Sequence, residues 1–168
     1  RALTHTNGTL DLNGKTLTVG TTYETGGGTK NLTFNGGTLI CSGSGSFAFN
    51  NLNPTGYTTT AGTGTGTISM TSNSAKSFVG GGTTFNCTLN QGGFGALTIT
   101  GANTFNNITN TVQPASVLFT AATTNRLSQD CCRANTTGLN LTTSFNVNIT
   151  TITTAGTKAP NLLSLEND

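Results

Sequence analysis

The stretch "KNLTFNGGTLIC" at residues 30–41 returns without a gap as "KSFVGGGTTFNC" at residues 76–87. Lys, Gly, Thr and Cys coincide at four positions of this alignment, and two leucines of the first copy fall on phenylalanines of the second. The offset of 46 residues lies within the period that is typical of solenoids. We interpret it as two coils of about 23 residues, each made of two or three short strands. The sequence therefore predicts an all-β protein, a β-solenoid similar to a parallel β-helix.

A second internal similarity lies further along the chain. "FNNLNP" (49–54) matches "FNNITNTVQP" (105–114), but at an offset of 56 residues. The longer offset predicts an insertion of about ten residues between the two copies. "GGFGALTITG" (92–101) is the segment that we expect to be inserted.

The amino-acid composition favours strands over helices. The chain has 39 Thr, 21 Asn and 23 Gly, all of which have low helix propensity, and no apolar stripe with a helical period persists. Short segments of alternating polarity are separated by Gly- and Asn-rich turns, where Asn tolerates left-handed backbone. The expected strands include "TLDLNG" (9–14), "KTLTVG" (15–20), "NLTFNG" (31–36), "GTISM" (66–70), "TFNCTL" (84–89), "ALTITG" (96–101), "VLF" (117–119) and "FNVNITTI" (145–152). A β-sandwich or jelly roll is the alternative fold, because it has the same pattern of short strands and turns.

Charge is scarce along the whole chain. Only 7% of the residues are charged and the net charge is +2, whereas an ordinary soluble domain is about one quarter charged. No basic stripe is available for phosphate groups, so we expect no nucleic-acid binding. No apolar run reaches the roughly 20 residues that cross a bilayer, so we expect no membrane insertion.

The chain length fits one continuous domain. We expect residues 1–127 to form a repetitive solenoid body. Residues 128–168 depart from the repeat and are expected to form a β-rich C-terminal cap or assembly segment.

Four cysteines are the candidate site residues, since their even number allows two disulfides in three pairings. They are Cys41, Cys87, Cys131 and Cys132, and the pairing stays open. Buried free thiols are the alternative. No CxxC or Cys/His spacing indicates a metal site.

Catalytic chemistry has few candidates. The acids are Asp11, Glu24, Asp130, Glu166 and Asp168. A glycosidase needs two carboxylates facing one another, and only Asp11 with Glu24 could be brought together by one coil. His5 is the sole histidine and has no nucleophile motif near it. We therefore expect no enzyme, no catalytic residue, no cofactor and no metal.

The run from residue 75 to 127 carries a resemblance to a known group of proteins. It contains three motifs in succession: K-x-F-x-GGG-x-T, L-x-I-x-G-x-N-T-F-N-N-[LI] and V-x-F-x-A-x-T-T. This pattern resembles repeat modules of phage tail and virion-appendage proteins and related secreted β-solenoid proteins. The resemblance implies a structural or adhesive role in a virion, and so an extracellular location. We expect copies of the chain or other virion proteins to cover its exposed strands and coil ends, because unpaired edges favour association, with a trimer as the expected oligomer.

Other functions stay open at this point. The main alternative is a secreted or cell-surface bacterial adhesin that binds carbohydrate, such as a host surface glycan, with Tyr23 or Tyr57 as platforms for sugar stacking. Ice binding by Thr-x-Thr spacings, as in residues 60–67 and 97–100, and an enzyme acting on polysaccharide are further alternatives.

Overall fold

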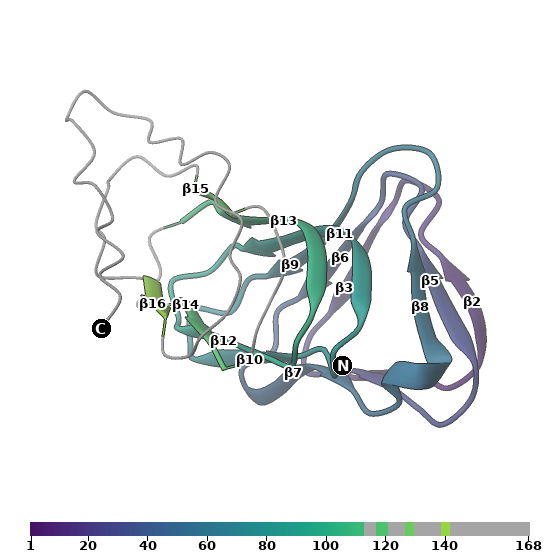
Figure 1. Cartoon of the computed structure of the whole chain (residues 1–168), viewed down its shortest axis with the longest axis horizontal. Coiled ribbons are helices and arrows are strands. Elements are labelled where there is room, and N and C mark those ends of the chain that lie inside the picture. The colour runs from purple at the N-terminus through teal and green to yellow at the C-terminus, as the bar shows by residue number, and fades with distance from the viewer. Residues whose placement is uncertain (113–116, 121–126, 130–138, 142–168) are drawn as a thin grey trace.

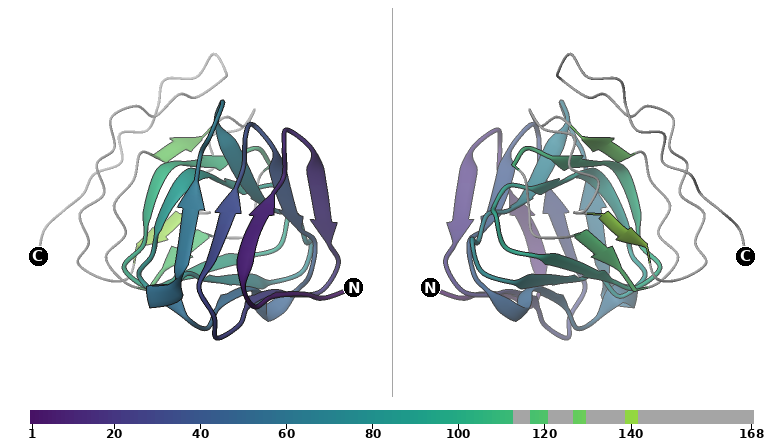
Figure 2. Two further views of the ribbon diagram at one scale, coloured as in Figure 1. Left: turned by 90° about the vertical axis from the view of Figure 1, so that its right-hand side faces the viewer. Right: turned by 90° about the vertical axis from the view of Figure 1, so that its left-hand side faces the viewer.

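The computed structural model describes residues 1–112, 117–120, 127–129 and 139–141. Every strand pairing within these residues is parallel, and successive coils stack on one another around a common interior (Figures 1 and 2). The predicted β-solenoid is confirmed, with about five turns and coils about 22 residues apart.

The strands form three sheets that make the sides of the solenoid. Sheet A runs in the order β1 (Leu3–His5), β4 (Tyr23–Thr25), β7 (Gly45–Asn51), β10 (Lys76–Val79), β12 (Leu97–Thr100), β14 (Val117–Phe119) and β16 (Leu139–Leu141). Sheet B consists of β2 (Gly8–Asp11), β5 (Lys30–Thr33) and β8 (Tyr57–Thr60). Sheet C runs in the order β3 (Thr16–Val19), β6 (Thr38–Cys41), β9 (Gly66–Met70), β11 (Thr84–Gln91), β13 (Thr104–Asn110) and β15 (Leu127–Gln129). A short 3₁₀ helix, Pro54–Gly56, precedes β8.

Alternation of side chains explains why these segments are strands. In β12 the side chains of Leu97 and Ile99 are buried, whereas Thr98 and Thr100 face outward and are half-buried. The same period of two residues recurs in β5 and β10. All the strands expected from the sequence are found, except that 145–152 lies outside the described residues.

Asn-Gly pairs turn the chain from sheet B to sheet C in the first two coils. Asn13 and Gly14 have φ of 48° and 71°, and Asn35 and Gly36 have φ of 47° and 77°. Asn adopts this left-handed region more readily than other residues with a Cβ, and Gly adopts it freely. The expected role of Asn at the turns is therefore confirmed.

The cross-section changes after the third coil. Sheet B ends at β8; in the following coil the long strand β11 first contacts β8 and then continues directly into sheet C, where it pairs with β9. The side chain of Thr59 makes the junction: its Oγ1 accepts a hydrogen bond from Asn86 N–H (2.7 Å), and Asn86 Nδ2 donates to the Thr59 carbonyl (2.7 Å). The coil that follows is shorter than the one before it: paired residues of sheet A are 29 positions apart from Phe49 to Phe78, but 21 apart from Lys76 to Leu97.

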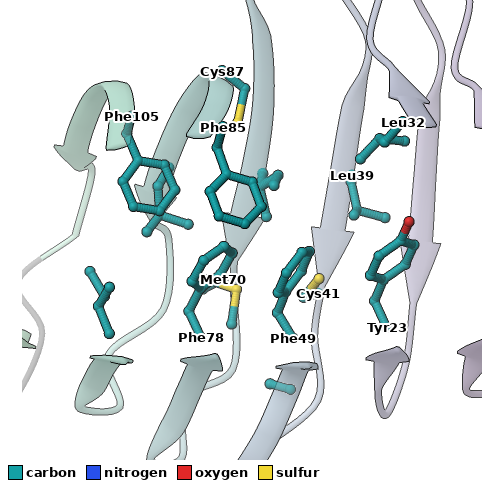
Figure 3. Packing of buried hydrophobic residues seen from close by; sticks show 14 of the residues in the cluster. Tyr23, Leu32, Leu39, Cys41, Phe49, Met70, Phe78, Phe85, Cys87 and Phe105 are labelled. Atoms are coloured by element: carbon teal, nitrogen blue, oxygen red, sulfur yellow. The ribbon is translucent and has the colours of Figure 1, made fainter. Parts of the chain in front are cut away.

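A column of aromatic rings fills the interior (Figure 3). From sheet A, Phe49 stacks between Tyr23 (5.2 Å between ring centroids) and Phe78 (4.2 Å). From the opposite side, Phe85 stacks on Phe105 at 5.1 Å and meets Phe78 edge-on at 5.0 Å. Offset stacked and edge-on arrangements are the favourable geometries for aromatic pairs. The aromatic column thus joins four consecutive coils.

The structure corrects the register of the predicted repeat. Lys30 lies in sheet B and pairs with Gly8 and Tyr57, whereas Lys76 lies in sheet A. The two similar segments are therefore different corners of the solenoid, because every corner uses the same strand, Gly turn and strand pattern. The coil length was nevertheless predicted correctly.

The second similarity is also out of register. Phe49 belongs to sheet A and Phe105 to sheet C, so the two FNN segments are not equivalent. The expected insertion at 92–101 is wrong, because β12 pairs with both β10 and β14 and is a regular strand of sheet A.

Little of the expected C-terminal segment, 128–168, falls within the described residues. Where it does, in the last two residues of β15 and in β16, the chain continues the parallel pairing: β15 pairs with β13, and β16 with β14.

Candidate functional site

The outer face of sheet C presents a regular array of side chains, all of them polar except Ile40. Outward positions stack from coil to coil in two columns, opposite the buried column of Leu39, Ile68, Leu89 and Ile108. We call the two columns together the hydroxyl–amide face. One column contains Thr16, Thr38, Thr67, Thr88 and Asn107, and the other contains Thr18, Ile40, Ser69, Asn90 and Thr109.

Hydrogen bonds run along this face parallel to the solenoid axis. Thr109 Oγ1 donates to Asn90 Oδ1 (3.0 Å), and Asn90 Nδ2 donates to Ser69 Oγ (3.1 Å). These bonds join three coils through side chains alone. None of the ten residues of the face is ionisable, so its interactions do not depend on pH.

Sheet B carries a similar network on its outer surface. Asn31 Oδ1 accepts hydrogen bonds from Thr58 Oγ1 and Thr60 Oγ1, both at 3.1 Å, and its Nδ2 donates to Thr33 Oγ1 (2.9 Å). Such a surface offers hydroxyl and amide groups to a partner, and Asp11 in β2 is the one charged residue among the outward positions of its three strands.

The two acids in the described residues are not paired. Asp11 lies in β2 of sheet B and accepts hydrogen bonds from Asn13 N–H and Asn35 Nδ2. Glu24 lies in β4 of sheet A, where its Oε2 accepts from Asn50 Nδ2 at 3.3 Å. One coil therefore does not bring these carboxylates together, as a glycosidase would require. Asp130, Glu166 and Asp168 lie outside the described residues.

His5 belongs to a buried polar cluster with two tyrosines. Its Nε2 lies 3.1 Å from the Gly8 carbonyl, and its Nδ1 lies 2.9 Å from Tyr23 Oη. Because a carbonyl only accepts, the neutral ring carries its proton on Nε2, and Nδ1 accepts from the Tyr23 hydroxyl. Tyr57 Oη lies 3.4 Å further along the same chain of hydroxyls.

The environment of this cluster suppresses its acid–base chemistry. Burial, together with the nearby charge of Lys30, lowers the pKa of His5. Burial raises the pKa values of Tyr23 and Tyr57. His5 is therefore neutral at physiological pH and the hydroxyls stay protonated, which suits a structural hydrogen-bond chain.

The expectation that Tyr23 or Tyr57 offers a platform for sugars is wrong. Their exposed fractions are 0% and 2%, because both rings belong to the aromatic column. The large apolar side chains that do reach the surface among the described residues are Phe47, Leu52 and Phe94.

Cys41 and Cys87 are free thiols buried on the inside of sheet C. Burial raises the pKa of Cys41 to about 12 and also raises that of Cys87, so neither forms a thiolate readily. Both fit the alternative of small buried apolar residues. Cys131 and Cys132 lie outside the described residues.

Two lysines point into the interior, a feature that the sequence reasoning missed. Lys30 and Lys76 have exposed fractions of 1% and 2%, and the ammonium of each donates to a backbone carbonyl of the preceding turn, Gly28 O and Ser72 O respectively. Strand alternation could have found Lys30, because it lies on the same face as Leu32.

No group of three or more His, Cys, Asp or Glu side chains in the described ranges is placed to hold a metal ion. The same ranges contain no helix with the length and apolar character of a membrane span. No family model, curated protein or solved structure matches the chain. The geometry of the solenoid itself is therefore the basis for a functional proposal.

Proposed function

We propose that this chain is a non-enzymatic structural protein of a virus particle: a bacteriophage tail fibre, spike or capsid-decorating module that self-associates. The observation that supports this most is that polar side chains, both on the outer surface and in the interior, are used in hydrogen bonds within the solenoid. Three residues of the hydroxyl–amide face are hydrogen-bonded from coil to coil, whereas His5, Lys30 and Lys76 are buried against backbone or hydroxyl partners. This arrangement favours rigidity over reactivity.

The parallel ladders support a mechanical role. Each coil is hydrogen-bonded to the next through its backbone, and the side-chain bonds of sheets B and C add a second connection. Paired backbone groups are not available to water or to proteases without opening a coil. Such a body suits a particle that must survive outside a cell.

The first coil supports self-association. Among the strands that the structure describes, β1, β2 and β3 each pair on one side only, and the inward residues Leu3, Leu10 and Leu17 are only partly buried. Unpaired strand edges beside apolar side chains favour the addition of another strand or coil. The partner would be another copy of the chain or an adjoining virion protein, and we propose a trimer as the assembled state.

Immunogold electron microscopy of the source culture tests the virion role. Antibodies raised against the folded chain should label particles that band at virion density, at one fixed position on each particle. Label on cell envelopes and none on particles would overturn the proposal. Light scattering coupled to size exclusion tests self-association separately: we expect three times the chain mass, and a monomer at all concentrations would contradict it.

The carbohydrate-binding adhesin has one observation in its favour. Phe47 and Phe94, with exposed fractions of 56% and 60%, could provide apolar surfaces next to the hydroxyl and amide groups. Envelope labelling together with hits on a glycan array that are lost in Phe94→Ala would favour this alternative.

A further inference from the structure

Three polar side chains lie buried at the corner where sheet C leads into sheet A. Lys76 begins β10, Gln91 ends β11 and Asn110 ends β13, and their exposed fractions are 2%, 0% and 8%. Gln91 pairs in register with Met70 on one side and with Asn110 on the other. In the column of inward side chains formed by Met70, Gln91 and Asn110, an apolar residue is therefore followed by two amides in the next two coils.

The orientation of the Gln91 amide is fixed by its neighbours. Its Nε2 donates to the carbonyls of Gly93 (2.9 Å) and Gly95 (2.7 Å), which only accept, so the nitrogen must face them. Both of its N–H groups are used. Gln91 Oε1 and, in the next coil, Asn110 Oδ1 accept no hydrogen bond from the residues that the structure describes. A buried polar atom without a partner is costly, so a donor for these two oxygens is required.

Lys76 provides a matching free donor nearby. Its ammonium donates to Ser72 O and to Gly95 O, both at 2.8 Å, which uses two of its three N–H groups. Gly95 O is shared with Gln91 Nε2, so the ammonium and the amide lie next to one another. The corner thus contains one spare donor and two spare acceptors.

The chemistry of these groups selects the ligand. A cation would be repelled by the Lys76 ammonium, and an anion would face two oxygens that carry partial negative charge. A water molecule accepts one hydrogen bond and donates two, which matches the spare groups, and buried water typically makes about three such bonds. We propose that one internal water is bound here, accepting from Lys76 Nζ and donating to Gln91 Oε1 and Asn110 Oδ1.

A crystal structure of the chain at a resolution that shows ordered water tests this site. We expect a peak about 2.7–3.2 Å from all three atoms. A direct hydrogen bond between Lys76 Nζ and Gln91 Oε1 with no peak would overturn the proposal. An anomalous signal at the site after rubidium or bromide soaks would also overturn it, because the ligand would then be an ion.

A pair of variants at adjacent positions provides the control. Gln91→Met keeps the length of the side chain but removes the amide, so the water peak should disappear. Asn90→Ala changes the neighbouring outward residue and should leave the peak in place. If Gln91→Met does not fold, nuclear Overhauser contacts between a long-lived water and the Gln91 side-chain amide protons decide the question on the unmodified chain. Their absence would contradict the proposal.

Discussion

Replacing Phe49 by alanine tests whether the aromatic column holds the coils together. Phe49 is fully buried, stacks on Tyr23 and Phe78 and meets Phe85 edge-on at 5.7 Å. Removal of a buried phenylalanine costs about 3–5 kcal/mol, and we expect about 4 kcal/mol because rings from four other strands would border the cavity. With an m value of about 2 kcal/mol per molar urea, the unfolding midpoint should fall by about 2 M.

Urea titration followed by tyrosine fluorescence is the assay, since the chain has no tryptophan and both its tyrosines lie in the column. Phe47→Ala is the matched control on the same strand, because Phe47 is 56% exposed. It should change the free energy of unfolding by no more than about 0.5 kcal/mol. If the urea midpoint shifted equally in the two variants, the aromatic column would not contribute to stability beyond the backbone hydrogen bonds between coils, and the reasoning would be refuted.

Three further predictions use other buried features. Gly66→Ala should destabilise the body by about 3 kcal/mol or more, because its Cβ would lie 2.1 Å from an aromatic ring carbon, whereas Gly27→Ala, with nothing within 4 Å, should be neutral in the same titration. The pKa of His5 is lowered in the folded protein, so as the pH falls the unfolded chain is protonated at His5 before the folded one. The free energy of unfolding should therefore decrease as the pH drops through about 6.5. In His5→Gln, the difference between the urea midpoints at pH 7.5 and pH 5.5 should be smaller. Cys41 and Cys87 should react with iodoacetamide only in urea, and peptide mass mapping that finds them modified in the native protein would contradict their burial.

The strands could be predicted because they depend on local chemistry. Alternation in a segment such as 97–100 fixes which side chains are buried, and Asn or Gly fixes where the chain turns. The coil length followed from the offset of 46 residues between the two similar segments, which is close to two coils. The equivalence of positions between coils did not, because threonine occurs on the outside of every sheet and a self-alignment shifted by one corner still matches at several positions. Lys30 and Lys76 show that slip.

The candidate site was harder to predict for a related reason. The hydroxyl–amide face exists only after closure of the solenoid, since Ser69, Asn90 and Thr109 are about 20 residues apart along the chain and meet only by stacking. The internal polar corner could have been suspected, because Gln91 follows Leu89 at a spacing of two residues and so shares its buried face. Its hydrogen-bond inventory required the turn carbonyls, whose direction no pattern in the sequence gives.

The distribution of apolar contacts along the axis bears on how such a body would assemble. In a solenoid each coil contacts only its neighbours, so stability is close to a sum of coil and interface contributions. The aromatic column extends from Tyr23 to Phe105, whereas the first coil contributes the partly buried Leu3, Leu10 and Leu17. The first coil should therefore open before the middle ones. A partner coil stacked on β1, β2 and β3 would bury those leucines and pair the free edges, so assembly would stabilise the part of the solenoid that its own core stabilises least.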